Sequence, residues 1–381
     1  MQKQIKEPLG QDWIRTQVIE QDLCTGCGAC VNLCPYQKIH KDNTINLHLC
    51  DLDDGRCRSY CPRSPVDLDR LRNALFDPAN FIPELGPFKG LYLTRATDQK
   101  VRAAAQHGGT VSAFMKLALE AGLIDTAILA GSSVNHLPES QYVYDPVRVA
   151  ATAGSRFVVS PTVAGFNLIS TGPAAKIGVV ATPCQALALA KMRVNAWPND
   201  VDRTQKLALV IGLFCGWALD WRKLKRLLAD EVGDATVTGM DIPPSKHACM
   251  EVYTDEGTTA IPIDKVTPCM RNACNYCFDM TCEFSDLAVG SARSSDGWPV
   301  DKGWNQTIVR SQLGQDLFDL AKEKGVLEFK DLPAENLDKL KNASANKKRA
   351  CLDKLTMKTG SEDDLVYLDC KDAAVSRIKG V

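Results

Sequence analysis

The sequence contains no apolar run long enough to cross a lipid bilayer, which as a helix requires about 20 consecutive, mostly apolar residues. Its first residues are not followed by the apolar core of a secretion signal. The formal net charge is only −1, so no excess of charge favours nucleic acid or an anionic membrane surface as a partner. We therefore expect a cytoplasmic protein with neither a membrane span nor a nucleic acid partner.

Cysteine, in contrast, is plentiful, with 16 among the 381 residues. Cytosolic thiols are kept reduced, so clustered cysteines in this chain indicate metal ligands in preference to disulfides. A chain of this length also exceeds one small domain and predicts two or three of them.

The first cysteine cluster has the spacing C-x2-C-x2-C-x3-C-P, which is typical of bacterial ferredoxins. Gly26 and Gly28 lie between its cysteines and let the backbone curl tightly. The pattern predicts an iron–sulfur site that transfers single electrons. A zinc knuckle needs only two C-x2-C pairs and has no use for the third cysteine or the C-P ending. If the site were a zinc knuckle or a disulfide framework, the full spacing would have to arise by chance. The four cysteines are Cys24, Cys27, Cys30 and Cys34.

A second run repeats the C-x3-C-P ending with Cys57, Cys61 and Pro62. In two-cluster ferredoxins the fourth cysteine of each run binds the other cluster. One 4Fe-4S cluster is then expected on Cys24, Cys27, Cys30 and Cys61, which leaves Cys34, Cys50 and Cys57 for the second. Asp53 stands where the missing cysteine is expected. Either Asp53 or water completes a 4Fe-4S cluster, or the site holds a 3Fe-4S cluster, or Asp53 merely caps the turn before Gly55.

The composition changes beyond residue 65, where prolines mark a linker that ends at residue 87. Apolar segments at 90–96, 124–130, 177–181 and 207–213 predict strands, and 110–121, 185–193 and 220–230 predict helices between and after them. This alternation predicts an α/β domain with a mostly parallel sheet. The expected domains are an N-terminal arm (1–20), a small ferredoxin-like α+β domain (21–75), the larger α/β domain (88–325) and a helical C-terminal extension (326–381).

A third group of cysteines belongs to the α/β domain. Cys184 and Cys215 lie just beyond two predicted strands, at the sheet edge where ligands normally bind, and Cys274 and Cys277 form a C-x2-C pair. Zinc suits four such scattered cysteines as well as iron does. Among the unassigned cysteines, Cys269 and Cys282 are spare neighbours of the pair, and Cys351 and Cys370 are isolated and interpreted as structural.

A glycine turn, Gln106-His107-Gly108-Gly109-Thr110, precedes the predicted helix at 110–121. Exposed backbone N–H groups at a helix start suit a phosphate or the carbonyl edge of a flavin ring. The same residues also suit a turn without a ligand.

In their order along the chain these motifs, with Gly154-Ser155-Arg156, Thr182-Pro183-Cys184-Gln185 and Gly212-Leu213-Phe214-Cys215, resemble the family of coenzyme F420 hydrogenase/dehydrogenase beta subunits. The resemblance implies an FAD or FMN held by Gln106, Gly108, Gly109, Thr110, Gly154, Ser155 and Arg156. It also implies a 4Fe-4S cluster on Cys184, Cys215, Cys274 and Cys277.

The function implied by the resemblance is that of an oxidoreductase subunit. It passes electrons between a two-electron carrier, of deazaflavin or nicotinamide type, at the flavin and one-electron 4Fe-4S clusters. Its partners are the redox subunits of a hydrogenase, formate dehydrogenase or heterodisulfide-reductase-like complex. The alternative is a non-catalytic iron–sulfur relay that connects two redox partners without a substrate of its own, and a zinc-stapled structural protein is a third. Bound-flavin absorbance separates the first from the second.

Overall fold

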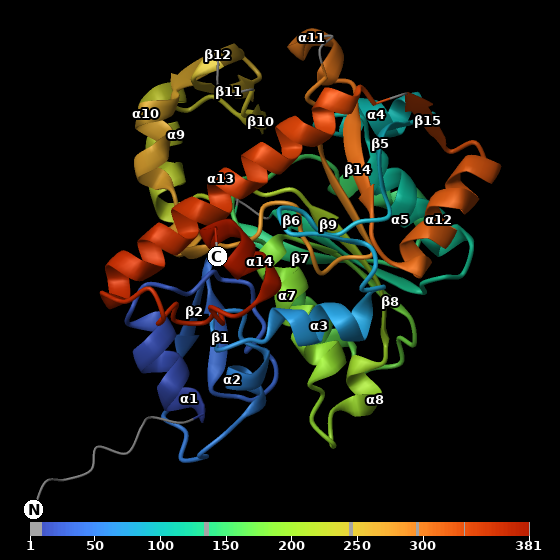
Figure 1. Cartoon of the computed structure of the whole chain (residues 1–381). Helices are drawn as coiled ribbons and strands as arrows, with labels where there is room; N and C mark the ends of the chain where they lie inside the picture. The colour runs from blue at the N-terminus through green and yellow to red at the C-terminus, as the bar shows by residue number, and fades with distance from the viewer. Residues whose placement is uncertain (1–9, 133–136, 244–246, 295–296, 331, 381) are drawn as a thin grey trace, which may run out of the picture.

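The computed structural model describes residues 10–380, except 133–136, 244–246, 295–296 and 331, so residues 1–9 of the expected arm lie outside the described part. Its centre is an eight-stranded sheet (Figure 1). In spatial order the strands are β15 (Leu327–Lys330), β5 (Gly90–Ala96), β14 (Asn305–Val309), β13 (Leu287–Ser291), β9 (Leu207–Leu213), β8 (Ile177–Ala181), β6 (Thr126–Ser132) and β7 (Pro138–Val143).

The four neighbouring strands β13, β9, β8 and β6 are paired in parallel. β5 has the same direction, because two antiparallel pairings separate it from β13 through β14. Five of the eight strands thus point one way, and β15, β14 and β7 point the other. The predicted α/β fold with a mostly parallel sheet is confirmed, and the antiparallel pairings lie toward the edges.

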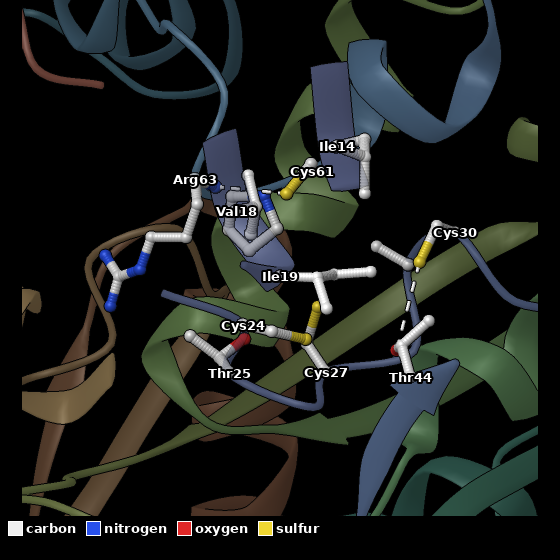
Figure 2. A pocket seen from close by; sticks show the side chains of 12 residues that line it. Ile14, Val18, Ile19, Cys24, Thr25, Cys27, Cys30, Thr44, Cys61 and Arg63 are labelled. Atoms are coloured by element: carbon white, nitrogen blue, oxygen red, sulfur yellow. Dashed lines mark hydrogen bonds between the residues drawn. The ribbon is translucent and has the colours of Figure 1, made fainter. Parts of the chain in front are cut away.

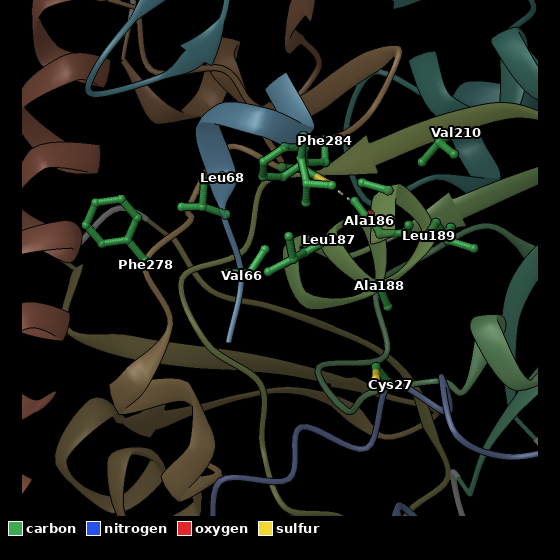
Figure 3. Close-up of a cluster of buried hydrophobic side chains, with 14 of the residues drawn as sticks. Cys27, Val66, Leu68, Ala186, Leu187, Ala188, Leu189, Val210, Phe278 and Phe284 are labelled. Atoms are coloured by element: carbon green, nitrogen blue, oxygen red, sulfur yellow. Dashed lines mark hydrogen bonds between the residues drawn. The ribbon is translucent and has the colours of Figure 1, made fainter. Parts of the chain in front are cut away.

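Side chains that alternate along the strands supply two cores, one on each face of the sheet. Val180 of β8 joins the core formed with Phe114 of α5 (Thr110–Glu120) and Phe318 of α12 (Gln312–Glu323). Its neighbours Val179 and Ala181 join the other core, with α6 (Thr162–Ile169) and α7 (Pro183–Val194) (Figure 3). All five residues of β8 are buried, as expected for a strand covered on both faces.

The N-terminal part contains α1 (Gly10–Trp13), the π-helical η1 (Ile14–Ile19), the antiparallel pair β1 (Gln37–His40) and β2 (Asn43–Asn46), α2 (Arg56–Tyr60) and α3 (Leu68–Leu75). It shares the second core with the sheet domain. Cys27, Tyr60 and Leu68 belong to the same buried cluster as Leu187 of α7 and Phe278 (Figure 3). The cysteine motifs are therefore packed against the sheet domain and not held on a tether.

A separate three-stranded sheet, β10 (Val237–Asp241), β11 (Cys249–Thr254) and β12 (Gly257–Pro262), packs with α9 (Trp221–Val232) and α10 (Ile263–Val266). The long helix α13 (Ala334–Thr359) crosses the molecule diagonally in Figure 1 and contacts η6 (Asn272–Tyr276), and α14 (Ala373–Lys379) follows it. The shorter elements are β3 (Phe81–Ile82), β4 (Gly86–Pro87), α4 (Gln99–Ala104), η3 (Pro146–Thr152), α8 (Val201–Thr204), η5 (Thr267–Cys269) and α11 (Trp298–Asp301). Across the described residues, no helix combines the length and apolarity needed to cross a membrane.

Candidate iron–sulfur and flavin sites

The four cysteines expected to bind the first cluster, Cys24, Cys27, Cys30 and Cys61, line one cavity (Figure 2). Its loop requires glycine, because Gly26 and Gly28 have φ values of 73° and 83°. A Cβ at Gly26 would lie 2.5 Å from the Asp42 carbonyl oxygen, and one at Gly28 would lie 2.7 Å from the Cβ of Ala164. Cys61, the last cysteine of the second run, thus lies beside the first three cysteines of the first run.

The loop is held from the sheet domain by α6. The side-chain amide of Asn167 donates to the carbonyls of Ala29, at 3.0 Å, and Val31, at 2.8 Å. Sequence reasoning missed the other wall of the cavity, which Ile14, Val18 and Ile19 supply from the segment interpreted as an arm (Figure 2). Ile14 and Val18 are only 1% and 2% exposed. Their spacing of four residues, which puts both on one face of a helix, was the sequence feature that could have predicted this wall.

Burial dominates the electrostatics of these thiols. It raises the pKa of Cys27, and the neighbouring thiols Cys184 and Cys61 raise it further. It likewise raises the pKa of Cys30, with Cys24 and Cys27 adding to the effect. Several thiols share a dry cavity, and a bound metal centre would supply the positive charge that keeps them deprotonated.

The second N-terminal group is also assembled. Burial raises the pKa of Cys57 to about 12, and Cys34 and Cys50 are among the thiols close enough to raise it further. Asp53, by contrast, is exposed. The turn is capped by its neighbour Asp54, whose carboxylate accepts the Gly55 N–H at 2.7 Å.

The third group lies where β8 and β9 end. Cys184 is the second residue of α7, and Cys215 follows β9. Cys274 belongs to η6, and Cys277 follows that helix directly. Burial raises the pKa of Cys215, and the positive charge of Lys347 lowers it. The thiols of Cys274, Cys277 and Cys184 raise this pKa further, so all four thiols are neighbours. Cys184 and Cys277 also line one cavity with Arg63 and Tyr367.

Cys277 differs from the other thiols in this group. Burial raises its pKa, but the positive charges of Lys347 and Arg63 outweigh that effect, and its pKa lies below the ordinary value. Lys347 is anchored by a 2.6 Å hydrogen bond to the carbonyl of Cys215. The C-terminal helix α13 thus supplies a cation to this site.

Three of the five remaining cysteines differ in their distance from the third group. Cys269 belongs to the core of the three-stranded sheet domain, and none of its charged neighbours is a cysteine. Cys282 is fully buried next to Cys184, and Cys351 of α13 lies beside Cys277 and Arg63. Cys351, isolated in the sequence, is therefore close to the third group in space.

Within the part of the chain that the structure describes, no three His, Cys, Asp or Glu side chains converge as ligands of a single ion. The thiols are spread around cavities instead. Ligands of a cubane each bind a different iron and need such a spread, whereas the ligands of zinc all lie about 2.3 Å from one ion.

The residues expected to hold a flavin gather near the start of α5. The hydroxyl of Ser155 donates to the side-chain carbonyl of Gln106, whose amide donates to Asp241, a carboxylate that is 1% exposed. Thr110 donates its backbone N–H to the side chain of Asn305 at 3.3 Å. The structure thus brings together two chain segments that are 49 residues apart at Gln106 and Ser155.

The glycines of this group differ in what surrounds them. A Cβ at Gly108 would meet Asn305 at 2.8 Å, and one at Gly109 would meet Val101 at 3.2 Å, so the protein itself fills the space beside both glycines. Beside Gly154 the nearest atom is an Arg156 nitrogen at 3.6 Å. The Nε of Arg156 is buried without a hydrogen-bond partner. Arg156 therefore brings a cationic N–H without a protein acceptor to this end of the group.

Comparison with known proteins identifies the family of the chain. A 4Fe-4S binding domain matches residues 18–37, which makes the chain an iron–sulfur protein. The N-terminal and C-terminal parts of the coenzyme F420 hydrogenase/dehydrogenase beta subunit match residues 91–166 and 174–335. Together the two matches cover more than half of the chain, which belongs to this family.

Its relatives are subunits of redox complexes. The chain is 26% identical over 334 residues to a subunit of the F(420)H(2) dehydrogenase of Methanosarcina mazei, covering 84% of this chain and 88% of the relative. It is 28% identical over 271 residues to the beta subunit of the coenzyme F420 hydrogenase of Methanothermobacter thermautotrophicus, covering 69% and 92%. A solved chain of the F420-reducing NiFe hydrogenase complex of Methanosarcina barkeri superposes with a TM-score of 0.65 at 25% identity, over 73% of this chain and 95% of the other.

Proposed function

We propose that this chain is an iron–sulfur flavoprotein subunit that passes electrons between a two-electron carrier and one-electron 4Fe-4S clusters within a larger redox complex. The observation that carries the proposal is the placement of the thiols. Cys24, Cys27, Cys30 and Cys61 line one cavity, and the next cavity, lined by Cys184 and Cys277, adjoins it through Pro62 and Arg63. Electron transfer requires such closely spaced sites.

The proposed ligand sets are Cys24, Cys27, Cys30 and Cys61 for the first cluster and Cys184, Cys215, Cys274 and Cys277 for the third. Cys34, Cys50 and Cys57 hold the second cluster, with water or a carboxylate as the fourth ligand. Backbone N–H groups donate to the ligand sulfurs, from Arg63 to Cys61 at 3.4 Å and from Ala218 to Cys274 at 3.3 Å. Hydrogen bonds of this kind adjust the reduction potential of a cluster.

The flavin, FAD or FMN, when bound supplies the conversion of a two-electron transfer into single-electron steps. Arg156 would bind its anionic part, and Gln106 and Ser155, already joined by a hydrogen bond, would fix the adjoining edge. The carrier is of deazaflavin type in this proposal, since the relatives named above include coenzyme F420 hydrogenase subunits.

Iron, sulfide and flavin analysis of anaerobically purified protein tests the proposal. We expect about 11–12 irons per chain, from two 4Fe-4S clusters and a second N-terminal cluster of three or four irons, together with one flavin. Cys184→Ser should remove about four irons, and Cys269→Ser, which changes a cysteine outside all three groups, should remove none. Fewer than about eight irons after full reconstitution contradicts a three-cluster protein. Full iron without flavin absorbance contradicts the flavoprotein and indicates the relay.

A further inference from the structure

Arg63 is the side chain that the two largest thiol groups share. It follows Cys61 and Pro62 directly, and it lines both the cavity of Cys24, Cys27, Cys30 and Cys61 and the cavity of Cys184 and Cys277. Its backbone N–H donates to the sulfur of Cys61. Its guanidinium points away from the first cavity in Figure 2 and lies over the ring of Tyr367, which lines the second.

The guanidinium of Arg63 is a buried cation without a carboxylate partner in the part of the chain that the structure describes. Arg63 is 2% exposed, and within the described residues no carboxylate lies within ion-pair distance of it. One nitrogen donates to the carbonyl of Ala273 at 2.9 Å, and Nε is buried without a hydrogen-bond partner. An isolated buried cation is strongly unfavourable unless an anion compensates for it.

Other buried cations of the same molecule are of two kinds. Lys191 and Arg310 donate to backbone carbonyls and have no ion pair among the described residues, whereas three others pair with carboxylates. Arg203 pairs with Asp200 at 2.6 Å, Arg271 pairs with Asp42 at 2.5 Å, and Lys348 pairs with Glu283. Arg63 differs from Lys191 and Arg310 in its position, because it lines both thiol cavities. A cluster with four thiolate ligands is itself an anion, because the thiolates outweigh the charge of the iron–sulfide core, and reduction adds a further negative charge.

We propose that Arg63 is the shared counter-ion of the first and third clusters and raises the reduction potentials of both. The inference rests on the function proposed above. A cation beside a cluster favours the reduced, more negative form, so that removal of the cation must lower the potential. Because one side chain serves both clusters, the two potentials shift together, and the driving force between neighbouring clusters is conserved.

Redox titration of the anaerobic full-length protein, followed by electron paramagnetic resonance, tests this inference. Arg63→Gln removes the charge and keeps an amide that can donate to Ala273. It should lower the potentials of two couples, with the reduction equilibrium of each shifted at least tenfold, or about 59 mV for one electron. The cluster of Cys34, Cys50 and Cys57 should move least, since none of these three cysteines lines either of the two cavities that Arg63 lines.

Two further variants separate charge from packing. Arg63→Lys keeps the charge and should remain close to wild type, and Arg70→Gln makes the same charge change at an exposed position of the same segment and should have no effect. Iron content of the wild type tests the proposed function by itself. If Arg63→Gln retains all irons with unchanged potentials, or if Arg63→Lys shifts them equally, the counter-ion role is refuted. If only Arg63→Gln fails to assemble the clusters, the requirement for the cation is upheld, and failure of both variants refutes it.

Discussion

Replacement of Asp200 by asparagine should destabilise the protein and loosen its N-terminal cysteines together. Asp200 is 3% exposed and accepts hydrogen bonds from Arg56, Arg203 and Tyr60. Arg56 and Tyr60 belong to α2, which lies between Gly55 and Cys61 and contains Cys57. This one carboxylate therefore ties the helix of the second cysteine run to the segment that starts α8.

The magnitude follows from what the substitution leaves behind. Asparagine leaves the guanidinium of Arg203, 8% exposed, without its carboxylate, and breaking a buried ion pair in this way costs about 3–5 kcal/mol. With an unfolding entropy of about 2.1 cal/mol/K per residue, this corresponds to a decrease of about 4–6 °C in the unfolding midpoint.

The pH dependence has a definite sign. Burial raises the pKa of Asp200, but the hydrogen bonds from Arg203, Tyr60 and Arg56 outweigh it, and the pKa is lower than that of a free aspartate. Its stabilisation is therefore present above the unfolded-state pKa of about 3.9 and is lost as the pH falls through the folded-state pKa. The variant should lose stability at pH 7 and approach the wild type in acid.

Scanning fluorimetry with iron analysis measures the effect. Asp202→Asn is the matched control, because it removes the same charge from an exposed position of α8. An unfolding midpoint of Asp200→Asn that coincides with that of Asp202→Asn at pH 7 would refute the reasoning.

Two further predictions concern the other sites. In metal-free protein, Lys347→Gln should slow alkylation of Cys277 near pH 7, since loss of the cation raises the pKa of that thiol. The control Lys354→Gln, which changes an exposed lysine of the same helix, should leave the alkylation rate unchanged. Peptide mass spectrometry measures alkylation at Cys277, and equal rates in the two variants would contradict the role of Lys347. Gly109→Ala should cost more stability than Gly122→Ala. Both glycines have a positive φ, at which an added Cβ costs about 1–2 kcal/mol, but only at Gly109 does that Cβ also meet Val101, at 3.2 Å. The flavin content of the two variants tests the glycine turn as a flavin contact: selective loss from Gly109→Ala supports that contact, and equal content contradicts it.

Sequence reasoning was strongest where the determinants are local. The spacing of Cys24, Cys27 and Cys30 is confined to one loop, and the match of a 4Fe-4S binding domain confirms the iron–sulfur prediction there. The predicted strands at 90–96, 177–181 and 207–213 coincide with β5, β8 and β9, since continuous apolar runs bounded by polar residues are typical of buried strands. The α/β class followed from these segments.

Elements without such runs were missed. β7 begins with Pro138 and contains Glu139, Ser140 and Gln141, a composition that an edge strand tolerates and a pattern search passes over. The side chains that complete the sites, such as Arg63, Tyr367 and Cys351, carry no motif. They meet because of the packing of α13 and of the segment that follows it, and only the folded structure reveals this.

The two cavities also differ in when the growing chain can complete them. Every residue that lines the first cavity lies between Ile14 and Arg63, so its wall is present once residue 63 has been synthesised. The second cavity is closed by Tyr367 and Leu368, and the carbonyl of Tyr367 accepts the backbone N–H of Val66 at 3.0 Å. Ribosomal synthesis therefore makes the two cavities available in a fixed order, and the second can be closed only after residue 368 has emerged.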